Sequence, residues 1–227
     1  MNPLGILPCA GRQTRMHELV FAKELLPLFD GRPVIKHSID ALRRITSDLL
    51  AIVNPNKKDL IKYLKTQSIS FIRTTSTGLP HSIHIGAKDH QRSILVALPD
   101  TFYQPEGVFV ELAHHPKPNV IGLFRSSHPD RFDSVKTLGD RITRYAIKTN
   151  PPLSPWTMGC LKLSPETIKL LKPRTTTSEP LLGDYLQPLI KQHLLHALKL
   201  KSSSYFDLGT PSSYIEYLLT RFHPSRI

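Results

Sequence analysis

The order of apolar and amphipathic segments predicts an α/β fold with a mixed, mostly parallel central sheet flanked by helices. Three observations lead to this prediction. Short apolar stretches typical of buried strands recur along the chain, stretches with helical spacing separate them, and small or acidic residues follow several of the apolar stretches. Because no Gly/Ser linker, charge block or internal repeat marks a boundary, we expect one domain over residues 1–227.

The first half of the chain alternates between expected strands and helices. Residues 4–7 are apolar and predict a buried strand. In residues 33–45, apolar side chains recur at helical spacing and Pro33 suits a first helical turn. The other elements expected before residue 90 are a strand at 49–53, a helix at 57–65, a strand at 70–72 and a helix at 78–89.

The second half begins with the most apolar strand of the chain, residues 93–98, which stops at Pro99 and Asp100. Ser164 and Pro165 predict the start of a helix that runs to Leu171, and Thr210 and Pro211 open the last helix. The remaining expectations are strands at 120–124, 134–137, 141–147 and 158–163, a helix at 182–192, and an end of the last helix near residue 222.

The charge balance favours anionic partners. Lys and Arg number 30 against 18 Asp and Glu, which gives a formal net charge of +12. The cations are scattered and aromatic residues make up only 7% of the chain, so dedicated nucleic-acid binding is not expected. Gly5 and Pro8 interrupt the first apolar run, and no charged region precedes it. We therefore expect no signal peptide or membrane span and a cytoplasmic location, and a homo-oligomer remains open.

Neither cysteine nor histidine spacing indicates a metal site. Cys9 and Cys160 lie far apart on apolar stretches, where buried free thiols are more common than a disulfide. The histidines include two pairs spaced three residues apart, His81 with His84 and His193 with His196, but no cysteine or carboxylate cluster accompanies them.

The turn after the first strand is a candidate phosphate site. Ala10 and Gly11 would let backbone N–H groups approach phosphate oxygens, Arg15 could bind two oxygens at once, and Lys23 could add a point charge. The segment has neither the P-loop nor the dinucleotide-binding glycine pattern. Taken alone, it could equally be a basic surface loop.

Asp100 and Asp207 are candidate magnesium ligands. Asp100 follows an apolar strand, and Asp207 lies between aromatic and aliphatic residues just before a tight turn and a helix. Two carboxylates brought together would suit Mg²⁺, which takes one or two carboxylates together with phosphate and water oxygens. Each also has a simpler interpretation, as a turn residue or as a local hydrogen-bonding group.

Four segments resemble the motifs of the sugar-phosphate nucleotidyltransferases, the nucleotide-sugar pyrophosphorylases, and especially members like glucose-1-phosphate thymidylyltransferase. Residues 8–16 and 22–28 are similar to that family's L-A-G-G-x-G-T-R-[LM] and P-K-x-L-L-P-[LV] signatures. Residues 94–102 look like its apolar strand ending in G-D-N-x-[FY], and residues 206–214 look like its W-x-D-[IV]-G-T-P motif. Two further segments are similar to family motifs. Residues 77–82 resemble the G-[LT]-A-x-[AS] segment whose backbone grips the nucleobase, and residues 142–148, followed by Gly159, resemble the strand ending in E-K-P and the later glycine of the sugar pocket. The resemblance runs from Leu4 to about Tyr214, with the motifs in the expected order.

The resemblance implies a Rossmann-like nucleotidyltransferase domain that condenses a nucleoside triphosphate with a sugar 1-phosphate. The products would be a nucleotide sugar and pyrophosphate, formed by direct, Mg²⁺-dependent in-line transfer. The residues it assigns are Arg15 and Lys23 for catalysis, Ala10, Gly11, Thr14, Gly78 and Leu79 for the nucleotide, Lys148 and Gly159 for the sugar phosphate, and Asp100 and Asp207 for Mg²⁺.

Several positions depart from the family pattern. Gln13 replaces a glycine of the phosphate turn, Ala22 replaces the proline before the lysine, and Ile147 replaces a glutamate that holds sugar hydroxyls in relatives. Arg73 stands about where many members place a glutamine that reads the base. Two alternatives therefore stay open: a cytidylyltransferase for a phosphorylated alcohol, and a nucleotide-sugar-binding regulatory protein with weak or no turnover.

Overall fold

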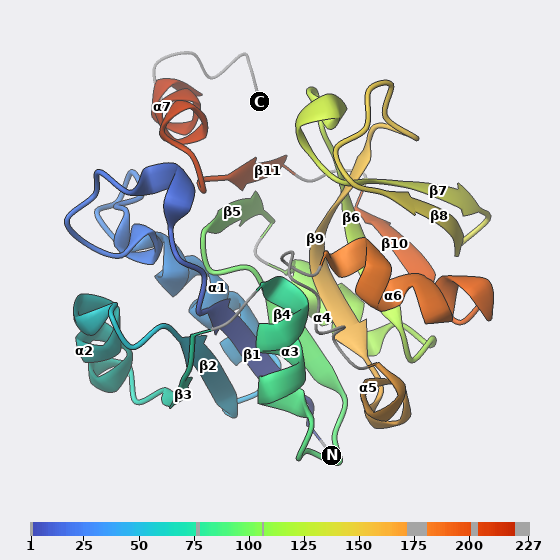
Figure 1. Ribbon diagram of the computed structural model, residues 1–227, viewed down its shortest axis with the longest axis horizontal. Helices are drawn as coiled ribbons and strands as arrows, with labels where there is room; N and C mark the ends of the chain where they lie inside the picture. Colours follow the sequence, from blue (N-terminus) through green and yellow to red (C-terminus); the bar gives the residue numbers. More distant parts are fainter. Residues whose placement is uncertain (1, 76–77, 106, 172–180, 201–203, 221–227) are drawn as a thin grey trace.

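Nine strands form one mixed sheet in the computed structural model, which describes residues 2–75, 78–105, 107–171, 181–200 and 204–220 (Figure 1). The spatial order is β3-β2-β1-β4-β9-β6-β10-β8-β7. The strands are β1 (Leu4–Cys9), β2 (Leu49–Val53), β3 (Ser70–Arg73), β4 (Ile94–Ala97), β6 (Val120–Arg125), β7 (Ser134–Leu138), β8 (Arg141–Ala146), β9 (Trp156–Leu163) and β10 (His196–Leu200).

The direction of pairing divides the sheet into two parts. Strands β3, β2, β1 and β4 are all parallel, as expected for strands joined through helices. Strand β9 then runs antiparallel between β4 and β6, and β8 runs antiparallel to both β10 and β7. The mixed sheet of the prediction is present, but its parallel character is confined to the first four strands and to the pair β6–β10.

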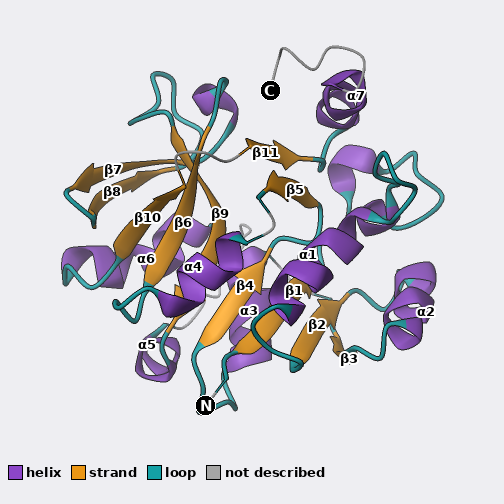
Figure 2. Ribbon diagram, turned by 180° about the vertical axis from the view of Figure 1, so that it is seen from behind, coloured by secondary structure: helices purple, strands orange, loops and turns teal. Residues whose placement is uncertain are grey.

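Helices cover both faces of this sheet. The helices α3 (Leu79–Ala87), α5 (Pro165–Leu170) and α6 (Leu182–Lys191) pack on one face, and α1 (Val34–Arg43), α2 (Lys58–Thr66) and α4 (Val108–His114) pack on the other (Figures 1 and 2). Side chains of β1 alternate between the two faces of the sheet. Ile6 packs in the apolar cluster under α3, whereas Leu7 and Cys9 pack in the cluster under α1. Within the described ranges, no helix has the length and apolar composition needed to cross a bilayer.

A small antiparallel ribbon lies beyond the carboxyl ends of β1 and β4 (Figure 1). It consists of β5 (Thr101–Gln104) and β11 (Ser204–Asp207), and the last helix, α7 (Pro211–Thr220), follows it. Aromatic rings join these parts: Tyr217 of α7 stacks on Phe29 at 4.3 Å between centroids and lies 5.3 Å from Phe102 of β5. The C-terminal helix thus packs against the segment that follows β1.

The structure confirms the predicted elements within one to three residues at each end. Ser164 caps α5, where its hydroxyl accepts a hydrogen bond from the Thr167 backbone N–H. Four elements were not predicted: β5, α4, β10 and β11. All four are short, with four to seven residues, and β5 and β11 also begin and end with polar residues, so neither shows a continuous apolar run. The expected end of the last helix, near residue 222, lies outside the described residues.

Both cysteines are buried, Cys9 in β1 and Cys160 in β9. Burial raises the pKa of both thiols, that of Cys160 to about 12. Since the thiolate is the reactive form, neither side chain is a nucleophile at neutral pH. Their role is packing.

A buried ion pair fastens the segment after β1 to the start of α2. The Lys57 ammonium lies 2.5 Å from a Glu24 carboxylate oxygen and donates to the Cys9 carbonyl at 3.1 Å. Only 8% and 2% of the Lys57 and Glu24 side chains are exposed. The Ala22 backbone N–H adds a 2.6 Å hydrogen bond to Asp59. The 3₁₀ turn η2 (Lys23–Leu25) is therefore held from the α2 side.

Replacing Lys57 by methionine should lower the free energy of unfolding by about 3–5 kcal/mol, because the Glu24 carboxylate would stay buried without its cation. Lys58→Met is the matched control: this neighbouring lysine is exposed, so we expect a change within about 0.5 kcal/mol. Urea unfolding followed by circular dichroism measures both. A loss below about 1 kcal/mol for Lys57→Met, the range of an exposed pair, would contradict burial of this interaction.

Candidate active site

The candidate site lies at the topological switch point of the sheet, between β1 and β4, where the order in which the chain adds parallel strands reverses. The chain passes from β1 to β2 and β3 on one side and then returns to β4 on the other side of β1. In open α/β sheets, ligands bind in the crevice at the carboxyl ends of strands at such a switch point. The loops that follow β1 and β4 contain the predicted phosphate turn and Asp100, and they meet where Lys23 pairs with Asp100.

The β5–β11 ribbon brings the two predicted metal ligands together. Asp207 pairs with Thr101, the residue after Asp100, and the Leu208 backbone N–H donates to the Asp100 carbonyl at 2.8 Å. A methyl group on Gly209 would lie 2.8 Å from Asp207 Oδ1 and 3.1 Å from Asp100 Oδ2. The two carboxylate oxygens are thus no farther apart than the sum of these distances.

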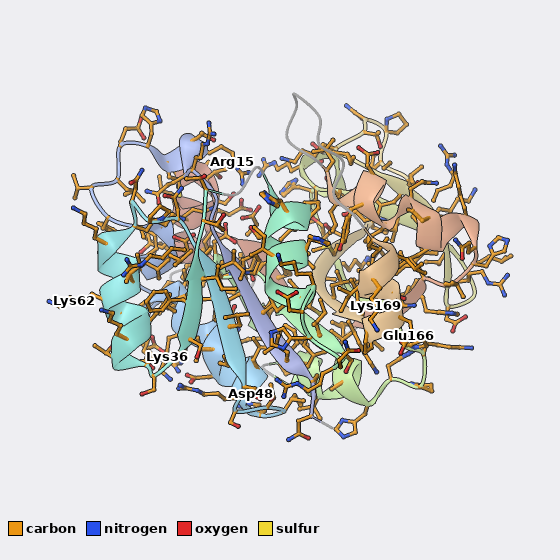
Figure 3. The ribbon with its side chains drawn as sticks, turned by 60° about the horizontal axis from the view of Figure 1, so that its bottom comes forward. Arg15, Lys36, Asp48, Lys62, Glu166 and Lys169 are labelled. Carbon is orange, nitrogen blue, oxygen red and sulfur yellow. The ribbon has the colours of Figure 1, made fainter. Side chains whose placement is uncertain are left out.

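Both predicted catalytic cations reach the same place. Lys23 Nζ lies 2.5 Å from Asp100 Oδ2, and each of these side chains is 15% exposed. Arg15 Nη2 would be 3.1 Å from the same methyl group on Gly209. Arg15 comes from the 3₁₀ turn η1 (Thr14–Met16), at the end of the molecule opposite the exposed residues Asp48 and Glu166 (Figure 3). A side chain at position 209 would collide with Asp207, so Gly209 permits the close approach of Arg15 and the two acids.

The electrostatics of the four groups are unequal. Burial would lower the pKa of Lys23, but the charges of Asp100 and Glu24 outweigh it and raise this pKa. Burial would raise the pKa of Asp100, but Lys23 outweighs it and lowers this pKa. Asp207 differs, because burial and then the neighbouring Asp100 charge raise its pKa. The site therefore contains one ionised pair and a second acid whose ionisation is opposed.

This donor set fits a magnesium ion. Mg²⁺ takes one or two protein carboxylates and completes its coordination with water and phosphate oxygens, and its charge would offset the opposed ionisation of Asp207. Asp207 Oδ1 already accepts the Gly209 backbone N–H at 2.8 Å, which fixes the carboxylate plane. In the part of the chain that the structure describes, no group of three or more His, Cys, Asp or Glu side chains forms an alternative site.

Gln13 lies in the phosphate turn with a left-handed backbone. Its backbone has φ 61° and ψ 32°, the left-handed conformation that glycine adopts most easily. Ala10 is buried at the end of β1, while Gly11 and Thr14 are exposed, and a methyl group on Gly11 would meet no atom within 4 Å. The backbone of the turn is therefore accessible to a ligand.

Gly78 and Leu79 lie at the start of α3, which packs against β1 and β2. Gly78 has φ 153°, and its carbonyl accepts the Ser82 backbone N–H at 3.1 Å, the first bond of the helix. Thr77, which belongs to the same sequence motif, lies outside the described residues. A helix N-terminus near the carboxyl ends of these strands favours an anionic ligand.

The residues predicted for the sugar phosphate lie on a second part of the sheet. Lys148 is exposed, follows β8 and has φ 43°. Gly159 lies in β9, where a methyl group would come 2.3 Å from the Phe124 ring and 2.9 Å from the Tyr205 ring. The structure thus gives Gly159 a packing role, and contact with a ligand stays a prediction for it.

Sequence reasoning gave no site role to Asp133 or Tyr145, and it considered Tyr205 only as a counterpart of the tryptophan in the motif before Asp207. The Tyr145 hydroxyl donates to Asp133 at 3.0 Å, and the half-buried Asp133 has a pKa raised by burial and lowered in part by Tyr145 and Lys148. The β7–β8 hairpin turns at Gly139 with φ 61°, and its register places Asp133 beside the residues before Lys148. The turn residues 138–141 were the sequence signal for this juxtaposition.

Tyr205 connects the two parts of the site. It precedes Asp207 in β11 by two residues, stacks on Phe124 at 4.9 Å between centroids and meets Phe132 edge-on at 6.1 Å. Phe132 is the neighbour of Asp133. The aromatic contacts therefore join the acid pair to the region around Asp133 and Lys148.

Comparison with known proteins finds a curated relative along most of this chain. A bifunctional GlmU protein of Methanococcus maripaludis is 25% identical over 218 aligned residues, which cover 91% of this chain and 51% of the relative. The chain thus spans about half the length of this curated relative.

Solved structures share the fold. A protein described as a glucose-1-phosphate thymidylyltransferase from Bacillus anthracis superposes with a TM-score of 0.81 at 19% identity, covering 94% of this chain and 93% of its own. An inositol-1-phosphate CTP transferase from T. maritima gives a TM-score of 0.80 at 14% identity, covering 97% and 95%. Both likenesses support the Rossmann-like nucleotidyltransferase fold.

The family is established by a match over most of the chain. The model of the MobA-like NTP transferase domain matches residues 5–199, which include the phosphate turn, Lys23, Asp100 and Lys148. The chain therefore belongs to the family of MobA-like NTP transferase domains, which confirms the nucleotidyltransferase family predicted from its motifs.

Proposed function

We propose that this chain transfers a nucleotidyl group from a nucleoside triphosphate to a sugar 1-phosphate in the cytoplasm, giving a nucleotide sugar and pyrophosphate. The observation that supports this proposal most strongly is the convergence of Asp100, Asp207, Arg15 and Lys23 around Gly209. Two acids for a divalent cation beside two cations for phosphate oxygens match the charges of a triphosphate as it reacts.

The chemistry requires positioning and charge neutralisation. An acceptor phosphate oxygen attacks the α-phosphorus, the bond to pyrophosphate breaks, and no covalent enzyme intermediate is needed. Lys23 would stabilise the α-phosphoryl oxygens in the transition state, and Arg15 would bind the β- and γ-phosphates. Asp100 and Asp207 would hold Mg²⁺, which supplies neutralisation of the phosphate charge. Lys148 would orient the acceptor phosphate.

The phosphate turn favours an enzyme over a protein that only binds nucleotide sugars. The replacement of glycine by Gln13 would disable the turn if the backbone took another path. Instead Gln13 adopts a left-handed conformation, Lys23 pairs with Asp100, and Arg15 lies beside Gly209. The principal departure from the family pattern therefore leaves the charged groups in place.

The acceptor region favours a ligand with few hydroxyl groups. Ile147 packs toward Gly183 at the start of α6, where a methyl group would lie 3.4 Å from its Cδ1. The acid beside Lys148 is Asp133, whereas Glu166 is an exposed residue in the first turn of α5 and Asp184 is an exposed residue in the first turn of α6. A phosphorylated alcohol is therefore the second candidate acceptor, with a cytidine nucleotide among the possible donors.

A substrate panel tests the proposal. The purified chain is incubated with Mg²⁺, each common nucleoside triphosphate and several phosphorylated acceptors, and pyrophosphate release is followed. We expect release that requires triphosphate and acceptor together. Triphosphate binding with no acceptor-dependent release in any pairing would instead support the binding protein.

Lys23→Ala should lower kcat by roughly two orders of magnitude, because it removes a preorganised charge from the transition state. Triphosphate affinity should fall less than kcat. Lys62→Ala, at a lysine on α2 far from Arg15, is the control and should leave both unchanged (Figure 3). Steady-state kinetics with a separate binding titration distinguish the two effects. A loss expressed entirely as weaker binding would make Lys23 a docking residue.

Asp207→Asn should abolish Mg²⁺-dependent turnover and leave the fold intact. Burial and the Asp100 charge already oppose ionisation of Asp207, so loss of its charge should not lower the free energy of unfolding. Turnover is measured across a Mg²⁺ titration and stability by urea unfolding, with the exposed Asp89→Asn as control. Wild-type activity in Asp207→Asn would remove Asp207 from the metal site.

The wild type should use glucose 1-phosphate poorly and a deoxy-sugar phosphate or a smaller phosphorylated alcohol better. A sugar hydroxyl beside Ile147 loses water without gaining a partner, which costs about 1–3 kcal/mol. Ile147→Glu should therefore raise kcat/KM for glucose 1-phosphate by at least about tenfold, with Ile147→Leu as control. Efficient wild-type turnover of glucose 1-phosphate, undiminished in Ile147→Glu, would show that this position does not set acceptor choice.

A further inference from the structure

We propose that Gln13 is a positioning residue that fixes the backbone of Lys23 relative to Arg15. The proposal rests on the proposed function, in which these two cations act on one triphosphate. The Gln13 side chain makes hydrogen bonds to backbone groups of Met16, Phe21 and Lys23. Its effect on the cations would therefore pass through the backbone of Lys23.

The side-chain amide of Gln13 closes the loop between η1 and η2. Its Nε2 donates to the Phe21 carbonyl at 2.9 Å and to the Met16 carbonyl at 3.1 Å. Its Oε1 accepts the Lys23 backbone N–H at 2.7 Å. One side chain thus binds the loop at its start, near its end and at the catalytic lysine itself.

Apolar packing holds only part of the loop. Met16 is buried, and Leu19 and Phe21 are partly buried against the same apolar cluster. Val20 is fully exposed, and the side chains of His17 and Glu18 are each 74% exposed. Exposed segments with few buried contacts open readily, so their geometry depends on specific hydrogen bonds. The Gln13 amide supplies them.

The other anchors of this segment come from the opposite side. Asp59 accepts the Ala22 N–H and Lys57 pairs with Glu24, so both tie η2 to the region of α2. Gln13 instead ties Lys23 to the turn that leads into η1, where Arg15 lies. The separation between the two cations therefore depends on this amide.

The chemistry of the side chain matters because the three bonds need both a donor and an acceptor. A glutamine amide provides both, whereas a glutamate carboxylate provides acceptors only. Glycine would adopt φ 61° without strain but would make none of these bonds. Gln13→Gly is therefore a clean test, since it relaxes the backbone requirement and removes only the amide.

In Gln13→Gly we expect kcat to fall by roughly tenfold to a hundredfold, as for small misplacements of catalytic groups, with a much smaller change in KM for the triphosphate. Gln13→Glu keeps the acceptor for the Lys23 N–H and loses both donors, so it should recover part of the lost kcat. The matched control is Ser68→Gly, at another left-handed residue, with φ 53°, in an exposed turn between α2 and β3.

Amide hydrogen exchange separates this proposal from the proposed function, because it needs no turnover. Exchange at the Lys23 N–H should be at least about tenfold faster in Gln13→Gly than in the wild type and unchanged in Ser68→Gly. Unchanged exchange at Lys23 would overturn the proposal, and so would faster exchange with an unaltered kcat. Absence of turnover in the wild type would overturn the proposed function, while the exchange rates would still decide whether Gln13 fixes Lys23.

Discussion

The arrangement of the site depends on the backbone pairing between β5 and β11. Asp100 and Asp207 are about half the chain apart in sequence, and Asp207 is the final residue of β11. The Leu208 N–H to Asp100 carbonyl bond and the pairing of Asp207 with Thr101 set the two acids side by side through main-chain geometry. Main-chain pairing fixes position more rigidly than side-chain contacts between loops could, and a metal site needs that rigidity.

Bringing two acids together creates an electrostatic cost that the surrounding residues offset. Lys23 neutralises Asp100 directly, and Arg15 reaches the same space from the phosphate turn. Asp207 is left with an ionisation that burial and Asp100 oppose. The same logic explains the buried Glu24 and Lys57 pair, which adds a second compensated charge beneath Lys23. A divalent cation with an anionic triphosphate would complete this balance.

The sequence predicted β1 to β4 and α1 to α3, because apolar residues form short continuous runs in most of these strands and recur at helical spacing in the helices. It also predicted which charged residues converge, since the motifs around Arg15, Lys23, Asp100 and Asp207 are specific. It did not predict β5 and β11, because these four-residue strands begin and end with polar residues and show no apolar pattern. Their pairing is nevertheless what brings Asp100 and Asp207 together. Asp133 was missed because a hairpin register, and not a local motif, brings it toward Lys148.

The departures from the family motifs acquire different meanings once they are placed in the fold. Gln13 has a left-handed backbone, and its side-chain amide makes hydrogen bonds to Phe21 and Lys23 that a glycine could not make. These bonds join the two halves of the loop that contains Arg15 and Lys23. Ile147 removes an acid from the acceptor side, while Asp133 presents another one beside Lys148, held by the Tyr145 hydroxyl. Under the proposed function, the first substitution would concern how the triphosphate end is held, and the second would concern which acceptor is chosen. The contact between Tyr205 and Phe132 joins these two regions of the site.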